Sequence, residues 1–144
     1  MIKQAEAGDT KIAAELAILL WPENDINALE NEMREYIISN NRAVFISYSE
    51  RTPIGFAQCS LRSDYVEGTK SSPVGYLEGV FVKEEFRKSG FGKKLILQCE
   101  DWARNKGCSE FASDCELNNT ESLQFHLRIG FEEANRIICF KKSL

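Results

Sequence analysis

The sequence predicts a domain of the α/β (α+β) class, in which helices lie on both faces of a mixed, mostly antiparallel central sheet. Two observations predict this class. Residues 43–82 hold three closely spaced segments rich in β-branched and aromatic residues, and the chain after them alternates helical and strand patterns. The length of 144 residues, with 43% hydrophobic and 28% charged side chains, fits one globular domain over residues 1–144.

Two helices are predicted in the first 40 residues. After a short strand at residues 2–4, Asp9 or Thr10 caps a first helix that ends at Trp21. Asn24 or Asp25 begins a second helix, which stops near residue 39. Apolar residues recur at helical spacing in both segments: Ile12, Leu16, Leu19 and Leu20 in the first, and Ile26, Leu29, Met33, Tyr36 and Ile37 in the second.

Three neighbouring strands are predicted next. Residues 43–49 and 54–61 are separated by four residues and read as an antiparallel hairpin. Residues 62–73 form a loop, and residues 74–82 return as a strand. Gly79 interrupts this strand, so we expect a bulge or a close backbone approach there.

The rest of the chain alternates helices and strands. Residues 92–106 carry an apolar face and are followed by Gly107, a typical signal for a helix end. A strand is predicted at residues 110–113, a helix at 121–129 and a last strand at 137–142.

Composition excludes several classes of function. The formal charge of -4 disfavours a broad nucleic-acid surface and fits a cationic partner better. Five cysteines without C-x-x-C spacing and a single histidine give no support for a metal site, so we expect reduced thiols and no metal. The N-terminal residues lack the apolar core of a signal peptide, and the apolar run at 16–21 is too short to span a membrane. We therefore expect a cytoplasmic protein with neither nucleic acid nor membrane as a partner.

A glycine-containing turn before the helix at 92–106 carries the strongest chemical signal. The first N–H groups of a helix lack intrahelical partners and lie at the positive end of its dipole, so they bind phosphate. Glycines let the backbone approach a phosphate, but a tight turn without a ligand would need them as well. The candidate binding residues are Arg87, Lys88, Ser89, Gly90, Phe91, Gly92 and Lys93.

The run from Arg87 to Gly92 resembles the R-x-x-G-x-G turn of the GNAT superfamily of acyl-CoA-dependent N-acyltransferases. In that superfamily the turn binds the pyrophosphate of coenzyme A. The resemblance implies a GNAT-type fold and acetyl-CoA as the acetyl donor. It also implies that Val80, Phe81 and Val82 pair with the pantetheine arm through their backbone amides.

Five further segments, in the same order along the chain, resemble one branch of this superfamily, the bacterial aminoglycoside 6′-N-acetyltransferases. This branch commonly dimerises, which implies a homodimer, and the apolar residues 137–140 are a possible pairing edge. The segments are Trp21-Pro22, Asp64-Tyr65-Val66 with Gly68, Ser71-Ser72-Pro73-Val74, Tyr76-Leu77-Glu78-Gly79 and Phe111-Ala112-Ser113-Asp114.

By this resemblance Trp21, Tyr65, Glu78 and Asp114 line the amine site, and Asn119 contacts acetyl-CoA. The chemistry of the residues agrees, because carboxylates bind the ammonium groups of a polycation and aromatic rings pack on sugars or ammonium groups. Each of these side chains also has a purely structural alternative, in the core, in a loop or in an ion pair.

The chain departs from these patterns at two positions. Four residues before the Gly-Phe pair that closes the last helix, many superfamily members carry a tyrosine that protonates the leaving thiolate, and here that position holds His126. We expect His126 to face the thioester sulfur, the alternative being a histidine with no chemical role. The branch carries Thr-Glu-Arg where this chain has Ala134-Asn135-Arg136, so Asn135 replaces one carboxylate of the amine site.

The sequence thus predicts an acetyl-CoA-dependent N-acetyltransferase that acts on a primary amine, with the 6′-amine of an aminoglycoside as the favoured acceptor. Glu78 or Asp114 is the candidate base, His126 the candidate acid, and the backbone N–H near Val80 the candidate oxyanion donor. Two alternatives remain: an N-acetyltransferase for another small amine, polyamine or protein amine, and a non-catalytic acyl-CoA-binding module on the same fold.

Overall fold

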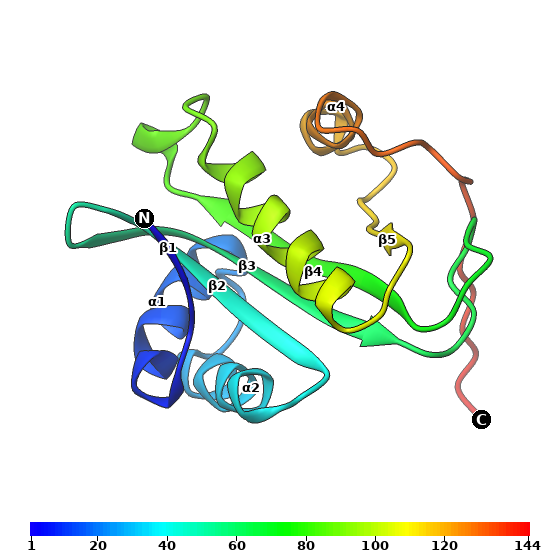
Figure 1. The fold of residues 1–144 in the computed structure, drawn as a ribbon. Helices are drawn as coiled ribbons and strands as arrows, with labels where there is room; N and C mark the ends of the chain where they lie inside the picture. The colour runs from blue at the N-terminus through cyan, green and yellow to red at the C-terminus, as the bar shows by residue number, and fades with distance from the viewer.

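In the computed structural model, which describes residues 1–144, five strands form one sheet in sequential order (Figure 1). The first four pair antiparallel, and the fifth pairs in parallel with the fourth, so the predicted mixed, mostly antiparallel sheet is confirmed. The strands are β1 (Ile2–Gln4), β2 (Arg42–Ser49), β3 (Thr52–Arg62), β4 (Val74–Val82) and β5 (Phe111–Ala112).

Helices cover both faces of this sheet, as predicted. Figure 1 shows α1 (Thr10–Leu20) and α2 (Ile26–Ile38) on one side and α3 (Phe91–Asn105) on the other, with α4 (Thr120–Arg128) on the side of α3. Two short 3₁₀ turns precede α1 and α3: η1 (Ala7–Asp9) and η2 (Glu84–Phe86).

The inner strand β2 carries apolar residues that pack on both faces of the sheet, because successive side chains of a strand point to opposite faces. Ala43 and Phe45 pack in the core cluster that contains α3, whereas Val44 and Ile46 pack in the cluster that contains α1 and α2. All four side chains are buried. The sheet is thus held between two hydrophobic layers, which makes it a rigid platform for side chains at its edges.

Helix boundaries follow the predicted caps. The Asp25 side chain accepts a hydrogen bond from the Ala28 N–H at 3.0 Å, and Trp21 ends α1. The predicted helix at 92–106 is observed one residue earlier at both ends, as Phe91–Asn105. The hairpin turn is tighter than predicted, because β3 already begins at Thr52.

The strand β4 contains both irregularities that Gly79 suggested. Gln58 of β3 pairs with Gly79 and Cys59 pairs with Leu77, so Glu78 has no partner and forms a bulge. A Cβ atom on Gly79 would lie 2.8 Å from the Trp21 ring, so glycine is needed for this close approach. The bulge turns the Glu78 side chain out of the regular alternation.

The prediction of a last strand at 137–142 is wrong: this segment does not join the sheet of its own chain. Residues 131–144 form no strand, and Ile137, Ile138 and Phe140 are 67%, 81% and 90% exposed. β5 is only two residues long and offers no edge of matching length. The segment instead runs past the loop at 62–73, where Asn135 Nδ2 donates to Glu67 Oε1 at 3.1 Å (Figure 1).

Candidate active site

The turn between β4 and α3 leaves a row of backbone donors without acceptors. The N–H groups of residues 88–93 donate no hydrogen bond within the protein, and the first bond of α3 runs from Lys94 N to Gly90 O at 3.1 Å. Gly90, at the N-cap, has a left-handed φ of 85° that favours glycine, and nothing lies within 4 Å of a Cβ built there. Six N–H groups and the positive end of α3 are therefore available to an anion.

The seven candidate residues of this turn divide into two groups. Lys88 to Lys93 form the donor row, whereas Arg87 bends back, and its Nε donates to the Val82 carbonyl oxygen at 2.8 Å. The guanidinium carbon of Arg87 lies 5.5 Å from the Phe81 ring centroid, so this side chain braces the turn against β4. A Cβ on Gly92 would lie 3.1 Å from the Phe125 ring, and glycine there lets α4 pack close to the start of α3.

One edge of β4 is free next to this turn. β4 and β5 pair only at Gly75 with Phe111 and at Tyr76 with Ala112. Beyond that point Val80, Phe81 and Val82 pair with β3 alone. An extended amide-containing chain can pair with such an unpaired strand edge. This is the arrangement that the sequence predicts for the pantetheine arm.

The two candidate carboxylates belong to one network of hydrogen bonds and a cation–π contact. Glu78 Oε1 accepts from Ser60 Oγ at 2.7 Å and from Nε and Nη2 of Arg62 at 3.1 and 2.9 Å. The Arg62 guanidinium carbon lies 3.4 Å from the centroid of the Tyr76 ring, and the Tyr76 hydroxyl donates to Asp114 Oδ2. The structure thus links Glu78 and Asp114 through Arg62 and Tyr76.

Tyr76 is a fixed donor in this network. Burial raises the pKa of its phenol, and the hydrogen bond to the Asp114 carboxylate raises it further, because loss of the proton would place a second negative charge beside the first. The phenol therefore stays protonated at neutral pH and orients the Asp114 carboxylate.

The two candidate aromatic residues occupy different environments. Trp21 packs against Gly79, beside the Glu78 bulge, and makes an edge-to-face contact with Phe56 at 6.0 Å between centroids. Tyr65 lies on the loop at 62–73 and is 75% exposed, and its hydroxyl accepts from the Gly68 N–H at 3.4 Å. The structure places Trp21 against Gly79, the residue after Glu78, and it leaves the Tyr65 ring projecting from the loop.

His126 on α4 is held at both ring nitrogens. Its Nδ1 lies 2.7 Å from the Ser122 carbonyl oxygen, which can only accept, so Nδ1 carries a hydrogen. Its Nε2 lies 2.8 Å from Ser113 Oγ. The Asn119 side chain accepts from the Ser122 N–H at 3.1 Å and caps α4. Ser113, the residue before Asp114, thus connects His126 to the segment that bears a carboxylate.

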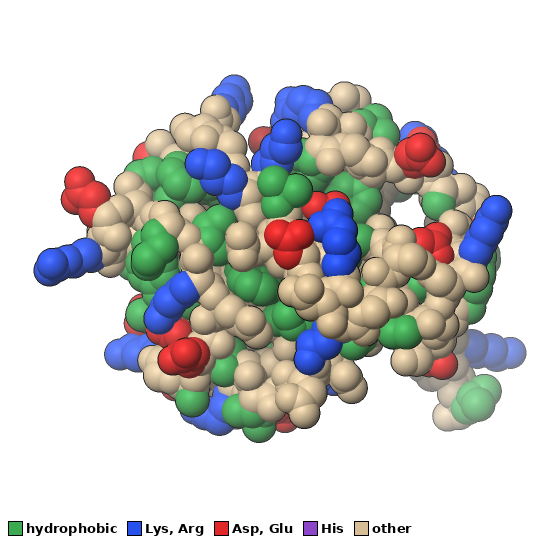
Figure 2. Space-filling view, in the orientation of Figure 1, with side chains coloured by type: hydrophobic (Ala, Val, Ile, Leu, Met, Phe, Trp, Pro, Cys, Tyr) green, Lys and Arg blue, Asp and Glu red, His purple; other side chains and the backbone are tan.

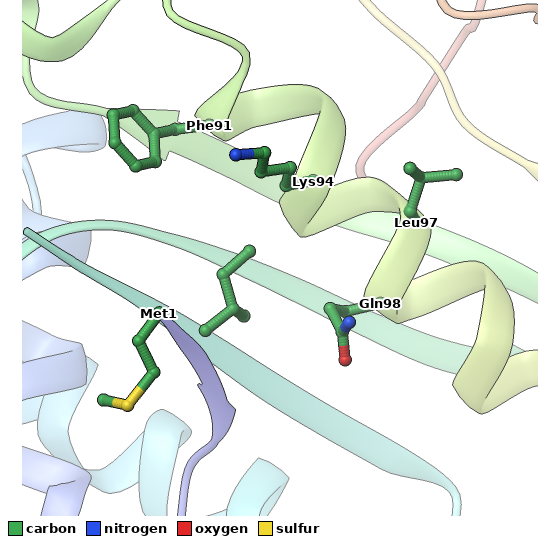
Figure 3. A pocket seen from close by; sticks show the side chains of 6 residues that line it. Met1, Phe91, Lys94, Leu97 and Gln98 are labelled. Carbon is green, nitrogen blue, oxygen red and sulfur yellow. The ribbon is translucent and has the colours of Figure 1, made fainter.

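A separate hollow of about 340 Å³ lies between β1 and α3 (Figure 3). Met1, Ile2, Leu97 and Gln98 line it together with Phe91 and Lys94, and none of the carboxylate residues contributes.

No group of three or more His, Cys, Asp or Glu side chains is placed to hold a metal ion. No helix combines the length and apolarity needed to cross a bilayer.

Comparison with known proteins decides the family. The model of the acetyltransferase (GNAT) family matches residues 12–131. The chain belongs to this family. The mixed sheet of this acetyltransferase is therefore the family's fold.

Individual members of the family are similar to this chain over most of their length. The acetyltransferase is 41% identical over 130 residues to the aminoglycoside N(6′)-acetyltransferase type 1 of Acinetobacter baumannii, which covers 90% of this chain and 88% of that protein. It is 43% identical to the enzyme of the same name from Salmonella typhimurium, over 85% of each chain. A structure of AAC(6′)-Iy with a bisubstrate analogue, CoA-S-monomethyl-acetylneamine, superposes with a TM-score of 0.96 at 39% identity and covers 100% of this chain and 98% of that one.

Four residues of the network are absent from the sequence-based site: Ser60, Arg62, Tyr76 and Ser113. Ser60 and Arg62 are two residues apart on β3 and share a face, as residues at that spacing do in a strand. Polar residues at alternate positions near the end of β3, Gln58, Ser60 and Arg62, were a usable signal. Which carboxylate it would meet depends on the bulge register, and the pattern alone does not give that register.

Proposed function

We propose that this acetyltransferase transfers the acetyl group of acetyl-CoA to the 6′-amine of aminoglycosides. The observation that carries the proposal is the full-length similarity to AAC(6′)-Iy, whose structures hold CoA and a bisubstrate analogue built on acetylneamine. The free donor row at residues 88–93 and the open edge of β4 provide places for the pyrophosphate and the pantetheine arm. Glu78 and Asp114 provide negative charge for a cationic amine.

The transfer needs a proton to leave the amine and another to reach the thiolate. The free amine attacks the thioester carbonyl, a C–N bond forms, and the C–S bond breaks to release the thiolate of CoA. Glu78 or Asp114 takes the amine proton directly or through a water, and the N–H near Val80 stabilises the oxyanion. We assign His126 to returning a proton to the leaving thiolate; this requires the imidazole to be protonated at both nitrogens, so that Nε2 donates through Ser113 Oγ.

Substrate contacts follow from the same chemistry. We assign Trp21 and Tyr65 to packing against sugar rings, and Asn119 to contact with acetyl-CoA in addition to its capping role. Asn135 replaces one carboxylate and is already bonded to Glu67, so it contributes no charge to a polycation. A ternary complex of enzyme, amine and acetyl-CoA is the expected reacting species.

A turnover screen tests the proposal. CoA release is measured with acetyl-CoA and three acceptor classes: aminoglycosides, linear polyamines and peptides with a free N-terminus. We expect kcat/KM for 6′-amino aminoglycosides to exceed the other classes at least tenfold. Turnover of another class alone would contradict the aminoglycoside assignment, and acetyl-CoA binding without any turnover would indicate a binding module.

We further propose a homodimer in which the C-terminal segment packs against a second copy. The exposed apolar residues of 137–140 support this proposal, because an apolar segment with unpaired backbone groups can pair with a strand edge of another chain. A hollow of about 380 Å³ lies between the end of α3 and the segment that leads into β5, lined by Cys108, Ser109, Glu110 and Phe111 among others. Figure 2 shows an opening through the molecule between β5 and the chain that leaves α4.

We place the enzyme in the cytoplasm, with neither nucleic acid nor a membrane as a partner. All five cysteines are unpaired, which suits a reducing compartment. On the face shown in Figure 2 acidic and basic side chains are interspersed, which gives no broad basic surface for nucleic acid. Cell fractionation with an antibody to the protein tests the location.

A further inference from the structure

Arg62 lies between the two groups that a substrate ammonium would contact at the Glu78 bulge. Its Nη2 is 2.9 Å from each carboxylate oxygen of Glu78, and its Nε is 3.1 Å from Oε1. The same guanidinium stacks on the Tyr76 ring at 3.4 Å. A cation held by a carboxylate on one side and an aromatic face on the other is in the environment that recognises ammonium groups.

This ion pair is open to solvent. The Arg62 side chain is 42% exposed and that of Glu78 is 23% exposed. Separating the pair therefore does not strand a fully buried charge, because water reaches both partners. Arg62 can leave Glu78 at moderate cost and remain hydrated.

The carboxylates of Glu78 and Asp114 differ in the charge of their hydrogen-bond partners. Asp114 accepts a hydrogen bond from a neutral phenol, whereas Glu78 is bound by a full positive charge. An ammonium that approaches Asp114 meets an uncompensated carboxylate. An ammonium that approaches Glu78 meets the like charge of Arg62 first.

We propose that Arg62 is a specificity-determining residue that occupies the Glu78 cation subsite of the empty enzyme and must be displaced by a substrate ammonium. The inference rests on the proposed function and explains how the amine site discriminates between polycations and monoamines. A polycation replaces the lost ion pair with several contacts of its own, at Glu78 and elsewhere. A monoamine offers one charge in exchange for one charge and gains little, so Arg62 discriminates against it.

Two variants test this, R62A and R62Q, of which R62Q keeps a side chain of similar length and guards against loss of folding. The matched control is R104A, because Arg104 forms an exposed ion pair with Asp101 on α3, outside the network. Kinetics are measured with a 6′-amino aminoglycoside and with 6-amino-6-deoxyglucose, a sugar with one amine. Thermal melting shows whether each variant is folded.

We expect both variants to raise kcat/KM for the monoamine sugar at least tenfold, so that the ratio of kcat/KM for the aminoglycoside to kcat/KM for the monoamine falls. Methylguanidinium chloride should compete with the amine in R62A, because it refills the subsite, and should have little effect on the wild type. R104A should match the wild type in every measurement.

A different pattern would overturn the proposal. If kcat falls tenfold in both variants and methylguanidinium restores it in R62A, Arg62 positions Glu78 and does not gate the subsite. Unchanged selectivity in folded variants would overturn it as well. A wild-type enzyme that acetylates the monoamine but no aminoglycoside would instead contradict the proposed function, and the Arg62 inference with it.

Discussion

At the residue scale, Glu78 and Asp114 have different hydrogen-bond partners, and this difference suggests different roles in the proposed amine site. Glu78 is fixed by Ser60 and a charged guanidinium, which suits an anchor for an ammonium group. Asp114 is oriented by a neutral hydroxyl from Tyr76 and follows Ser113, the partner of His126. We therefore favour Asp114 as the base.

Replacing Asp114 should separate catalysis from coenzyme binding. D114N loses a charge-assisted hydrogen bond to the amine, worth about 1.5–3 kcal/mol, and also the base. We expect kcat/KM for the aminoglycoside to fall at least tenfold while acetyl-CoA affinity, measured by calorimetry, stays within twofold. Glu116, two residues further on and outside the network, provides the control E116Q. Equal small effects of both changes would remove Asp114 from the site.

The Tyr76 phenol should leave a signature in stability at high pH. Its pKa is raised above the ordinary value of 10.0, so the folded protein keeps a proton that the unfolded chain loses. The contribution is complete below pH 10 and is lost as pH rises above it. Urea unfolding should show a steeper loss of stability above pH 10 in the wild type than in Y76F. Parallel curves for the two proteins would contradict the raised pKa.

At the scale of elements, the proposed coenzyme site depends on how β4 passes into α3. The positive φ at Gly90 starts the helix with six free N–H groups in a row, and the free edge of β4 leads up to them. Neither feature requires a side chain, so the phosphate contacts depend mainly on the backbone. Substitutions that block this backbone should act on binding more than substitutions of the neighbouring lysines.

G90E tests this element. A glutamate at Gly90 adds a negative charge where phosphate must lie and strains a left-handed residue, so we expect loss of measurable acetyl-CoA binding by calorimetry. G107E is a matched control, because Gly107 also has a positive φ and open space but lies beyond the other end of α3. Both variants should lose stability, and only G90E should lose binding. Equal affinity in G90E and the wild type would refute the site.

Most elements were predictable because their signals are local. Caps such as Asp25 and the apolar periodicity of residues 26–37 fix a helix without reference to the rest of the chain. The partner of Glu78 was not predictable, since Arg62 meets it only through the register of β3 and β4. The segment at 137–142 carries a strand composition, but composition does not say which edge it pairs with. That edge is absent from the chain's own sheet.

At the scale of the whole molecule, the apolar C-terminal segment at 137–140 is exposed and has no strand partner. We propose that this segment pairs with a second copy, because its own chain leaves it unpaired and exposed. The loop at 62–73 and Tyr65 lie next to the point where this segment leaves. A second copy would then border the amine site.

The mass in solution tests this assembly. Light scattering at micromolar concentration should give twice the mass of one chain, and the double change I138D and F140D should give a single-chain mass, because charges would enter an apolar contact. Leu117 is 77% exposed and lies outside the segment, so L117D is the control and should stay dimeric. A single-chain mass for the wild type would contradict the homodimer.

The most direct test of the central claim uses two aminoglycosides that differ only at the 6′ position, one with an amine and the other with a hydroxyl. Acetyl transfer is followed by CoA release, and the position of the acetyl group is determined by NMR. We predict rapid turnover of the 6′-amino compound, with the acetyl group on its 6′ nitrogen, and at least a hundredfold slower turnover of the 6′-hydroxyl compound. Equal turnover of the two, or acetyl on another amine, would contradict the account.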